Sequence, residues 1–247
     1  MMINFVVSDI HSFYSIFKKA LDEKGFDVNN ENHRLIICGD LFDRGKESKE
    51  LLNFLLSIPE NRLIIVKGNH EDLIEDCLEE LYNYSNISGH HITNGTLDTI
   101  AQLTNYNIYD LLAGDYKADV IKNRLTNYFN LIKRAVNYYE ISDYIFVHGW
   151  TPLIRKYEDL KTGDDISWKG ARWYNGMEDW NAGRKYPGKT IVCGHWHTSW
   201  GHSRLHKNGS EFGEDACFDP FIDEGIIALD GCIAYSKQCN VLVIEEK

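Results

Sequence analysis

Apolar runs and helix-like periodicities alternate regularly through the first third of the chain. Three of the runs have the length of buried strands, and they cover residues 2–8, 34–38 and 62–67. Apolar side chains recur at helical spacing after each run, over residues 13–24, 47–57 and 71–82. This βαβαβ order predicts a parallel sheet with helices packed against it, in an α/β fold.

The pattern changes between residues 84 and 140, where the chain is polar, rich in Asn and Tyr, and helical wherever it is periodic. We interpret this stretch as an inserted helical cap within a single domain that spans residues 1–247. Apolar runs of strand length resume at residues 143–147, 189–193, 226–229 and 241–244. The last two runs are predicted to form a hairpin joined across residues 231–240.

Five short polar motifs each begin where a predicted strand ends. They are Asp9-Ile10-His11, Gly39-Asp40-Leu41-Phe42-Asp43-Arg44-Gly45, Gly68-Asn69-His70-Glu71, His148-Gly149 and Gly194-His195-Trp196-His197. In open α/β sheets, ligands bind beyond the carboxyl ends of the strands. The predicted fold therefore gathers these motifs at one edge, and their Asp, His and Asn side chains are a mixture that divalent metals bind.

The motif side chains supply a candidate ligand set for two metal ions. Asp9 and His11 are two residues apart, so both can reach one ion, and the Asp40 carboxylate is the best candidate to bridge two ions. Neutral ligands come from further along the chain, at Asn69, His148 and His195. Such nitrogen and oxygen ligands suit Mn²⁺, Fe or Zn²⁺ better than Mg²⁺ alone. Two ions about 4 Å apart hold a bridging hydroxide and both oxygens of an in-line phosphoryl displacement.

Other motif residues match the remaining tasks of phosphoryl transfer. Arg44 can form a forked contact to phosphate oxygens. His70 beside Asp43 would form a dyad in which the carboxylate raises the pKa of the imidazole, and the imidazolium protonates the leaving oxygen. Arg172 is a candidate for a second phosphate-binding arginine. Glu71 is interpreted as structural, because acidic residues are favoured in the first turn of a helix.

On these motifs the chain resembles the calcineurin-like metallophosphoesterase superfamily, and the motifs at 39–45 and 68–71 look like its PPP branch. That branch contains Ser/Thr protein phosphatases, lambda-type phage phosphatases and symmetric diadenosine tetraphosphatases. The segment 227–231 also looks like the closing strand of the family, so the resemblance covers nearly the whole chain. It implies a four-layer α/β/β/α sandwich, with two central mixed sheets flanked by helices.

The resemblance also implies a role for each motif residue. Metal one would be bound by Asp9, His11 and Asp40, and metal two by Asp40, Asn69, His148 and His195. Phosphate would be bound by Arg44, and the general acid pair would be His70 and Asp43.

One departure from the PPP pattern is His197, because members of that branch usually have a single histidine in the last motif. In the wider superfamily the second histidine ligates metal one. His197 is therefore a further candidate ligand, and its presence weakens any transfer of protein-phosphatase specificity.

Composition narrows the partners without changing the predicted fold. The net charge is −11, which disfavours a broad surface for nucleic-acid duplexes, although bound metals would still attract a phosphate substrate. No apolar stretch is long enough to span a bilayer, and the first residues lead directly into the first motif. We therefore expect neither a membrane anchor nor a cleaved signal. The 6 cysteines match no zinc-finger spacing, and we expect free thiols in a reducing cytoplasm.

All 6 tryptophans fall between residues 150 and 200. One interpretation is the packing of an irregular segment. The other is an aromatic wall beside the metals that stacks a base or a peptide ring. Trp196 lies between two candidate ligands, so we expect it near the site in either case. The adjacent His90 and His91 of the insertion are interpreted as solvated side chains.

The leading hypothesis is a metal-dependent phosphatase that hydrolyses phosphomonoesters, on Ser/Thr phosphoproteins or small molecules, by in-line attack of a metal-bridging hydroxide. The alternative is a symmetric dinucleoside polyphosphate hydrolase, which the tryptophan cluster favours. A third hypothesis is a binding module that keeps the fold without catalysis. Such a module would have lost ligands, whereas every expected ligand is present. The acid excess and the Asp43-Arg44 pair disfavour a nuclease.

Overall fold

Two mixed sheets form the centre of the computed structural model, which describes residues 1–153, 160 and 164–246. The first sheet has the strand order β3-β2-β1-β9. Its strands β1 (Ile3–Val7), β2 (His33–Cys38) and β3 (Leu63–Val66) are parallel, as the βαβαβ pattern predicts. The intervening helices are α1 (Tyr14–Glu23) and α2 (Ser48–Ser57), with a 3₁₀ turn at Glu60–Arg62.

The second sheet has the strand order β4-β5-β6-β8-β7. Its parallel centre is made by β5 (Tyr144–Phe146), β6 (Thr190–Cys193) and β8 (Ile226–Ala228). Two short antiparallel strands form its edges, β4 (Tyr139–Ile141) and β7 (Phe221–Asp223).

The predicted hairpin between the last two strands is wrong. Strand β8 pairs with β6 and β7, whereas β9 (Leu242–Glu245) pairs antiparallel with β1 in the other sheet. The connection over residues 231–240 contains α12 (Ile233–Ser236), and it carries the chain from one sheet to the other.

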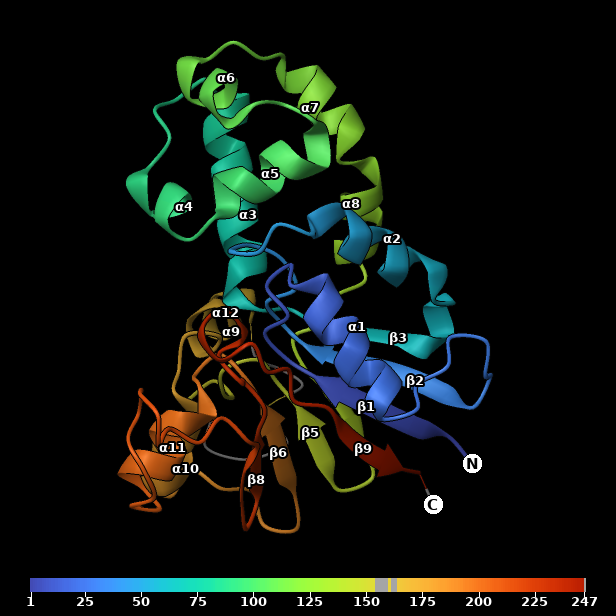
Figure 1. Cartoon of the computed structure of the whole chain (residues 1–247), viewed down its shortest axis with the longest axis vertical. Helices are drawn as coiled ribbons and strands as arrows, with labels where there is room; N and C mark the ends of the chain where they lie inside the picture. The colour runs from blue at the N-terminus through green and yellow to red at the C-terminus, as the bar shows by residue number, and fades with distance from the viewer. Residues whose placement is uncertain (154–159, 161–163, 247) are drawn as a thin grey trace.

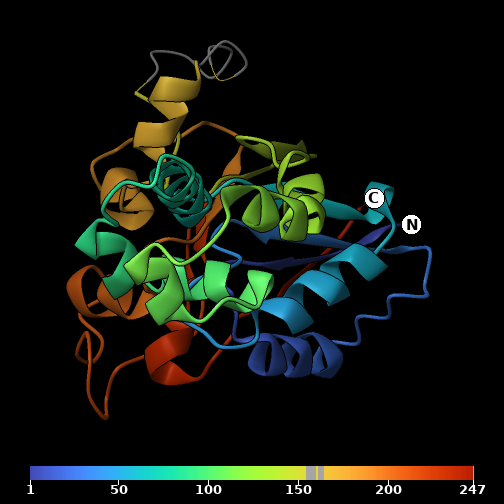
Figure 2. The same cartoon turned by 90° about the horizontal axis from the view of Figure 1, so that it is seen from above.

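Alternation of side chains along the strands produces the layered arrangement. On β1, Phe5 and Val7 join the core beneath the helices, and Val6 joins a separate core between the sheets with Phe146 and Val192. Helices α9 (Asp165–Ala171) and α10 (Gly176–Asn181) cover the outer face of the second sheet. Figure 2 shows α1 in dark blue and α9 in gold on opposite sides of the molecule. The implied α/β/β/α sandwich is confirmed.

The inserted region is helical, as predicted, and it stands above the first sheet in Figure 1. Its helices are α4 (Gly89–Thr93), α5 (Thr96–Thr104), α6 (Ile108–Ala113), α7 (Ala118–Arg124) and α8 (Thr126–Ile132), which follow α3 (Asn69–Tyr82). Apolar residues of these helices join the same core as α1 and α2. The predicted insertion extends two residues too far, because β4 begins at Tyr139. His91 is fully buried, so the prediction of a solvated histidine is wrong there.

All six cysteines are free thiols, and Cys38 and Cys193 are buried in their strands, as expected. Helix α11 (Thr198–Arg204) follows the last motif. Within residues 1–153, 160 and 164–246, no helix combines the length and apolar character that crossing a bilayer requires.

Candidate metal centre

Two groups of buried ligand side chains share one carboxylate. His11, Asp40 and His70 form one group and Asp40, His148 and His195 the other, with all ligand atoms of each group within 4.8 Å of one another. His11 Nε2 lies 3.7 Å from Asp40 Oδ2, and His148 Nε2 lies 3.2 Å from Asp40 Oδ1. Each oxygen of Asp40 therefore faces a different histidine, as expected of a bridging ligand.

Backbone carbonyls fix the orientation of two of these histidine rings. His11 Nδ1 donates to Phe42 O at 3.0 Å, and His148 Nδ1 donates to Cys38 O at 2.8 Å. A carbonyl only accepts, so Nδ1 carries the hydrogen and Nε2 presents its lone pair to the centre. This arrangement is typical of metal-binding histidines.

The surroundings of His148 Nε2 favour a positive charge, either a proton or a metal ion: burial lowers and the Asp40 carboxylate raises the pKa of this histidine, with a net shift to about 10. Asn69 Oδ1 lies 2.8 Å from this nitrogen and Asp40 Oδ1 lies 3.2 Å from it, so three electron-pair donors face one another. Burial and the nearby carboxylate of Asp230 raise the pKa of Asp9 well above its usual range, because a buried carboxylate beside another acid is costly to ionise without a counter-charge. A bound divalent ion would relieve both conditions. The side chains present therefore fit a metal centre.

Two of the four histidines in these groups, His11 and His195, are held neutral, as metal ligands must be. Burial lowers the pKa of His11 well below its usual range, with a further contribution from Arg44. Burial lowers the pKa of His195 to about 3, helped by the neighbouring His148.

Local backbone strain is concentrated in the motifs. Positive φ angles occur at six non-glycine motif residues: Asp9, His11, Asp40, Asp43, Arg44 and His195. Such conformations cost of the order of 1 kcal/mol or more each and persist only where the surroundings enforce them. Gly194 shows why the loops are so tight, because a Cβ there would overlap Asp9 Oδ2.

Glu71 is structural, and its contacts explain how two motifs are locked together. Helix α3 begins at Asn69, two residues earlier than predicted, and Glu71 caps it by accepting from Gly68 N at 2.7 Å. The same carboxylate accepts from Asp40 N at 3.1 Å and Leu41 N at 2.9 Å. Burial raises its pKa to about 7, followed by the charge on Asp40.

The predicted acid pair is assembled beside the shared carboxylate. His70 Nδ1 donates to Asp43 Oδ2 at 2.8 Å, and His70 Nε2 lies 3.8 Å from Asp40 Oδ2. Burial lowers and the carboxylates of Asp40 and Asp43 raise the pKa of His70, with a net upward shift. Arg44 is exposed, and its Nη2 lies 3.3 Å from His70 Nε2, so a phosphate oxygen could contact both.

Asp9 and Asn69 adjoin the two groups, whereas His197 and Arg172 have other partners. Both Asp9 oxygens accept from His195 N, at 3.1 and 3.0 Å. His197 Nδ1 lies 3.0 Å from Ser199 Oγ, and its Nε2 lies 3.4 Å from Glu211 Oε1. A ligand role for His197 stays a prediction.

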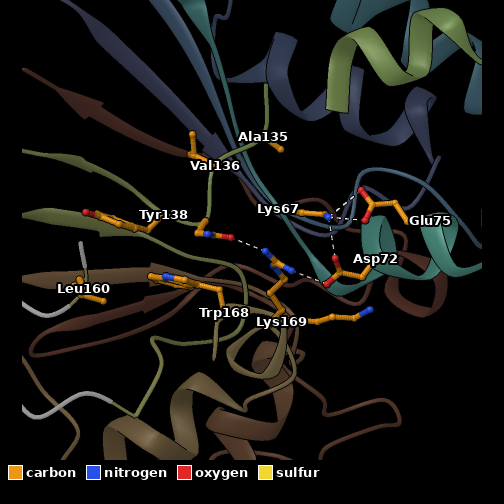
Figure 3. A pocket seen from close by; sticks show the side chains of 11 residues that line it. Lys67, Asp72, Glu75, Ala135, Val136, Tyr138, Leu160, Trp168 and Lys169 are labelled. Carbon is orange, nitrogen blue, oxygen red and sulfur yellow. Dashed lines mark hydrogen bonds and ion pairs between the residues drawn. The ribbon is translucent and has the colours of Figure 1, made fainter. Parts of the chain in front are cut away.

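The Arg172 guanidinium is buried and held away from solvent. It donates to Asp72 Oδ2 at 2.6 Å and to Asn137 Oδ1 at 2.5 Å. It lines a cavity of about 740 Å³ together with Lys67, Asp72 and Trp168, and Figure 3 shows Lys67 joined to Asp72 and Glu75 there. Phosphate binding by Arg172 stays a prediction, and the contact with Asp72 would compete with it.

The tryptophans divide between the two interpretations. Trp150, Trp168 and Trp180 are buried in the core of the second sheet. Trp173 and Trp196 are 49% and 37% exposed, with ring centroids 5.7 and 6.1 Å from that of His195. Packing therefore explains one set, and the exposed pair lies at the candidate centre.

Sequence reasoning did not single out Asp230, which is buried and whose backbone carbonyl accepts from Thr198 N at 2.8 Å. Burial raises its pKa. It follows an apolar strand-like run in the same way as Asp9 and Asp40, so that pattern could have identified it. Thr96 and Thr99, which contact Asp43, have no such signal.

Comparison with known proteins agrees with this geometry. The profile of the family described as calcineurin-like phosphoesterase matches residues 5–217. A symmetrical bis(5'-nucleosyl)-tetraphosphatase of Buchnera aphidicola is 39% identical over 70 residues, which are 28% of this chain and 24% of that protein. Serine/threonine-protein phosphatase 1 of Salmonella typhimurium is 39% identical over 72 residues, 29% of this chain and 31% of that protein. The chain thus spans only about a quarter to a third of these curated relatives.

Solved structures extend the likeness to the whole fold. The cold-active protein-tyrosine phosphatase of a psychrophilic Shewanella species superposes with a TM-score of 0.53 at 17% identity, over 99% of this chain and 76% of that one. At this identity the likeness concerns the fold alone.

Proposed function

The chain belongs to the calcineurin-like phosphoesterase family, and we propose that it uses two divalent metal ions to hydrolyse a dinucleoside polyphosphate. The observation that carries the metal-dependent part is the sharing of Asp40 by two groups of histidines. One ion would be held by Asp9, His11 and Asp40, and the other by Asp40, Asn69, His148 and His195. We expect Mn²⁺ to serve, because the ligands mix nitrogen and oxygen.

Bound ions would supply a water of lowered pKa and neutralise charge on the phosphoryl oxygens. The chain's own residues then account for the rest of the reaction. Arg44 is exposed beside His70 and would orient a phosphate oxygen through its planar fork. His70, oriented by Asp43, would give its Nε2 proton to the leaving oxygen.

An exposed aromatic rim supports a nucleotide substrate. The rings of Trp173 and Trp196 flank His195. From Trp196 the series continues through His197 to Phe212 and Tyr235, whose centroids are 5.3 Å apart and which are 48% and 54% exposed. Flat exposed rings beside a phosphate-binding centre suit the stacking of bases, which is worth about 1–3 kcal/mol per base. The Buchnera relative, named as a bis(5'-nucleosyl)-tetraphosphatase, supports the same choice.

The second candidate is hydrolysis of phosphomonoesters on Ser or Thr, the leading hypothesis from sequence. The name of the Salmonella relative favours it. Its alignment and that of the Buchnera protein are of similar length and identity, so our preference for a dinucleotide is supported mainly by the aromatic rim.

Side-by-side kinetics would test the proposal. The Mn²⁺-loaded protein is given diadenosine tetraphosphate, a phosphothreonine peptide and p-nitrophenyl phosphate, with Asp40→Asn as the blank. We expect kcat/KM for the dinucleotide to exceed that for the peptide about a hundredfold, which corresponds to about 2.7 kcal/mol. Symmetrical cleavage would yield ADP as the only nucleotide. The reverse preference would establish the second candidate instead.

Two variants would test the rim itself. Trp173→Leu and Trp196→Leu should each lower kcat/KM for the dinucleotide about tenfold, at the low end of the stacking range, and leave p-nitrophenyl phosphate hydrolysis unchanged. Tyr109→Leu is the matched control, because Tyr109 is a 75% exposed aromatic residue on cap helix α6. Equal losses on both substrates would count against base stacking.

A further inference from the structure

The first long helix of the inserted region begins directly against the acid pair. Gly95, which precedes α5, has φ of +81°, and a Cβ there would approach Arg44 N to 2.6 Å. Thr96 and Thr99 are fully buried on the face that α5 turns toward Asp43. The helix therefore packs on the backbone of the Asp43-Arg44 motif.

Hydrogen bonds from α5 hold both the backbone and the side chain of Asp43. Thr96 Oγ1 donates to Asp43 Oδ2 at 2.7 Å, and Asp43 N donates to Thr99 Oγ1 at 3.0 Å. Asp43 Oδ2 is the same atom that accepts from His70 Nδ1 at 2.8 Å. Asp43 Oδ1 is buried and has no hydrogen-bond partner in the described part of the chain. Thr96 and His70 are thus the two groups that set the direction of this carboxylate.

Three more contacts fasten the loop after Asp43 to the same helix. Gln102 Nε2 donates to Gly45 O at 3.0 Å, and Ser48 N donates to Gln102 Oε1 at 3.1 Å. Lys46 pairs with Asp98. Thr96, Thr99 and Gln102 are spaced three residues apart, so they lie on one face of α5, and this face contacts the loop.

We propose that Thr96 is a positioning residue for the acid pair: its hydroxyl orients the Asp43 carboxylate so that His70 directs Nε2 at the leaving oxygen. This role rests on the proposed function of His70. The helical insertion is then a part of the catalytic apparatus and not merely a cover over the substrate.

Loss of the Thr96 hydroxyl would leave a buried carboxylate with one hydrogen-bond donor in place of two. When a hydrogen bond to a charged group is lost, the rate of a step that depends on it falls by roughly tenfold to a hundredfold. The loss should fall on proton donation, because the Asp40 contacts to His11 and His148 do not involve α5.

The test uses two aryl phosphates that differ only in the leaving group. General-acid catalysis matters more for a basic leaving group, so phenyl phosphate depends on it more than p-nitrophenyl phosphate does. We expect Thr96→Val to lower kcat for phenyl phosphate at least about tenfold more than kcat for p-nitrophenyl phosphate. Thr96→Ser, which keeps the hydroxyl, should restore the wild-type ratio.

Matched variants make each outcome decisive. Thr104→Val is the control, because Thr104 is equally buried on α5 but its hydroxyl bonds Ile100 O in the same helix. His70→Asn is the reference for complete loss of the acid. Metal content and Tm are measured for all variants. Equal losses on both substrates, or a Thr96→Ser variant as impaired as Thr96→Val, would overturn the positioning role.

His70→Asn separates failure of this inference from failure of the proposed function. A leaving-group effect in His70→Asn but not in Thr96→Val would refute the role of Thr96 alone. An absence of the effect in His70→Asn would refute His70 as the acid, and the role of Thr96 with it.

Discussion

The two sheets contribute to the metal centre in different ways. The first sheet supplies its motifs at three successive strand ends, and their backbones bond one another, as in Asp9 N to Gly39 O at 3.1 Å and His11 N to Asp40 O at 3.0 Å. The second sheet supplies His148 and His195 to the two groups of ligand side chains. His148 reaches across the sandwich to Cys38 O, whereas His195 meets its neighbours through ring contacts and its own backbone N–H.

This difference indicates that the two sheets have different roles in the candidate metal centre. The first sheet forms a framework in which backbone hydrogen bonds between the loops hold several motif residues in strained conformations. The second sheet would complete the proposed ligand set, and it places the exposed rings of Trp173 and Trp196 beside His195. Under the proposed function, the first sheet would supply most of the groups that act on phosphate, and the second sheet would supply two metal ligands and the rings that select the substrate.

The largest effect is expected for Asp40, because its carboxylate faces histidines from both sheets. Asp40→Asn should reduce kcat/KM by about 10³-fold or more, roughly 4 kcal/mol, because one substitution weakens both metal positions. Asp76→Asn is the control, since Asp76 is a half-exposed carboxylate on α3 that pairs with Lys169. Nearly wild-type activity of Asp40→Asn at full metal occupancy would refute the bridging assignment.

Metal removal should reveal how strongly the ions join the two halves. At a free Mn²⁺ concentration of about 100 times Kd, binding should stabilise the folded state by about 2.7 kcal/mol. For a chain of this length, that corresponds to a rise in Tm of roughly 5–10 °C over protein treated with EDTA. Asp40→Asn should lose most of the rise. If saturating Mn²⁺ left the wild-type Tm unchanged, the predicted site would not bind the ion.

A smaller effect is expected at Gly39, where a loop of the first sheet packs closely against His148 of the second sheet. Gly39 has φ of +80°, and a Cβ there would overlap His148 Nδ1 and lie 2.7 Å from Gly68 Cα. Gly39→Ala should therefore lower the free energy of unfolding by at least about 2 kcal/mol and also reduce activity. Gly188→Ala separates strain from overlap, because Gly188 has φ of +75° with nothing within 4 Å. Denaturant unfolding would compare them, and equal losses would argue against a tight contact between the halves.

The smallest effect should be found at the aromatic rim. Trp173→Leu and Trp196→Leu should change the free energy of unfolding by no more than about 0.5 kcal/mol, because both side chains are substantially exposed. Trp150→Ala should cost about 3–5 kcal/mol, because Trp150 is buried in the core of the second sheet. Urea unfolding of the three variants would check this. Strong destabilisation by the two rim variants would show that Trp173 and Trp196 mainly contribute to packing.

Most of the framework was predictable from residues close together in sequence. The apolar runs marked the strands of both sheets, apart from the short edge strands β4 and β7, and the polar residues after the runs marked Asp9, Asp40 and Asn69 as neighbours. This works because parallel strands end at a common edge, so that a local pattern implies a spatial one. The pairing of His70 with Asp43 followed from the same reasoning.

Contacts between distant segments were decided only by the tertiary structure. Two adjacent runs near the end of the chain read as a hairpin, but β8 and β9 entered different sheets. The Arg172 guanidinium pairs with Asp72, and His197 lies beside Glu211. Helix α5 places the Thr96 hydroxyl against Asp43. Apolar periodicity specifies which face of an element is buried, but not which distant element covers it. Local sequence patterns were therefore enough to locate the loops with the candidate ligands, whereas the residues that support and surround these loops depend on packing between distant segments.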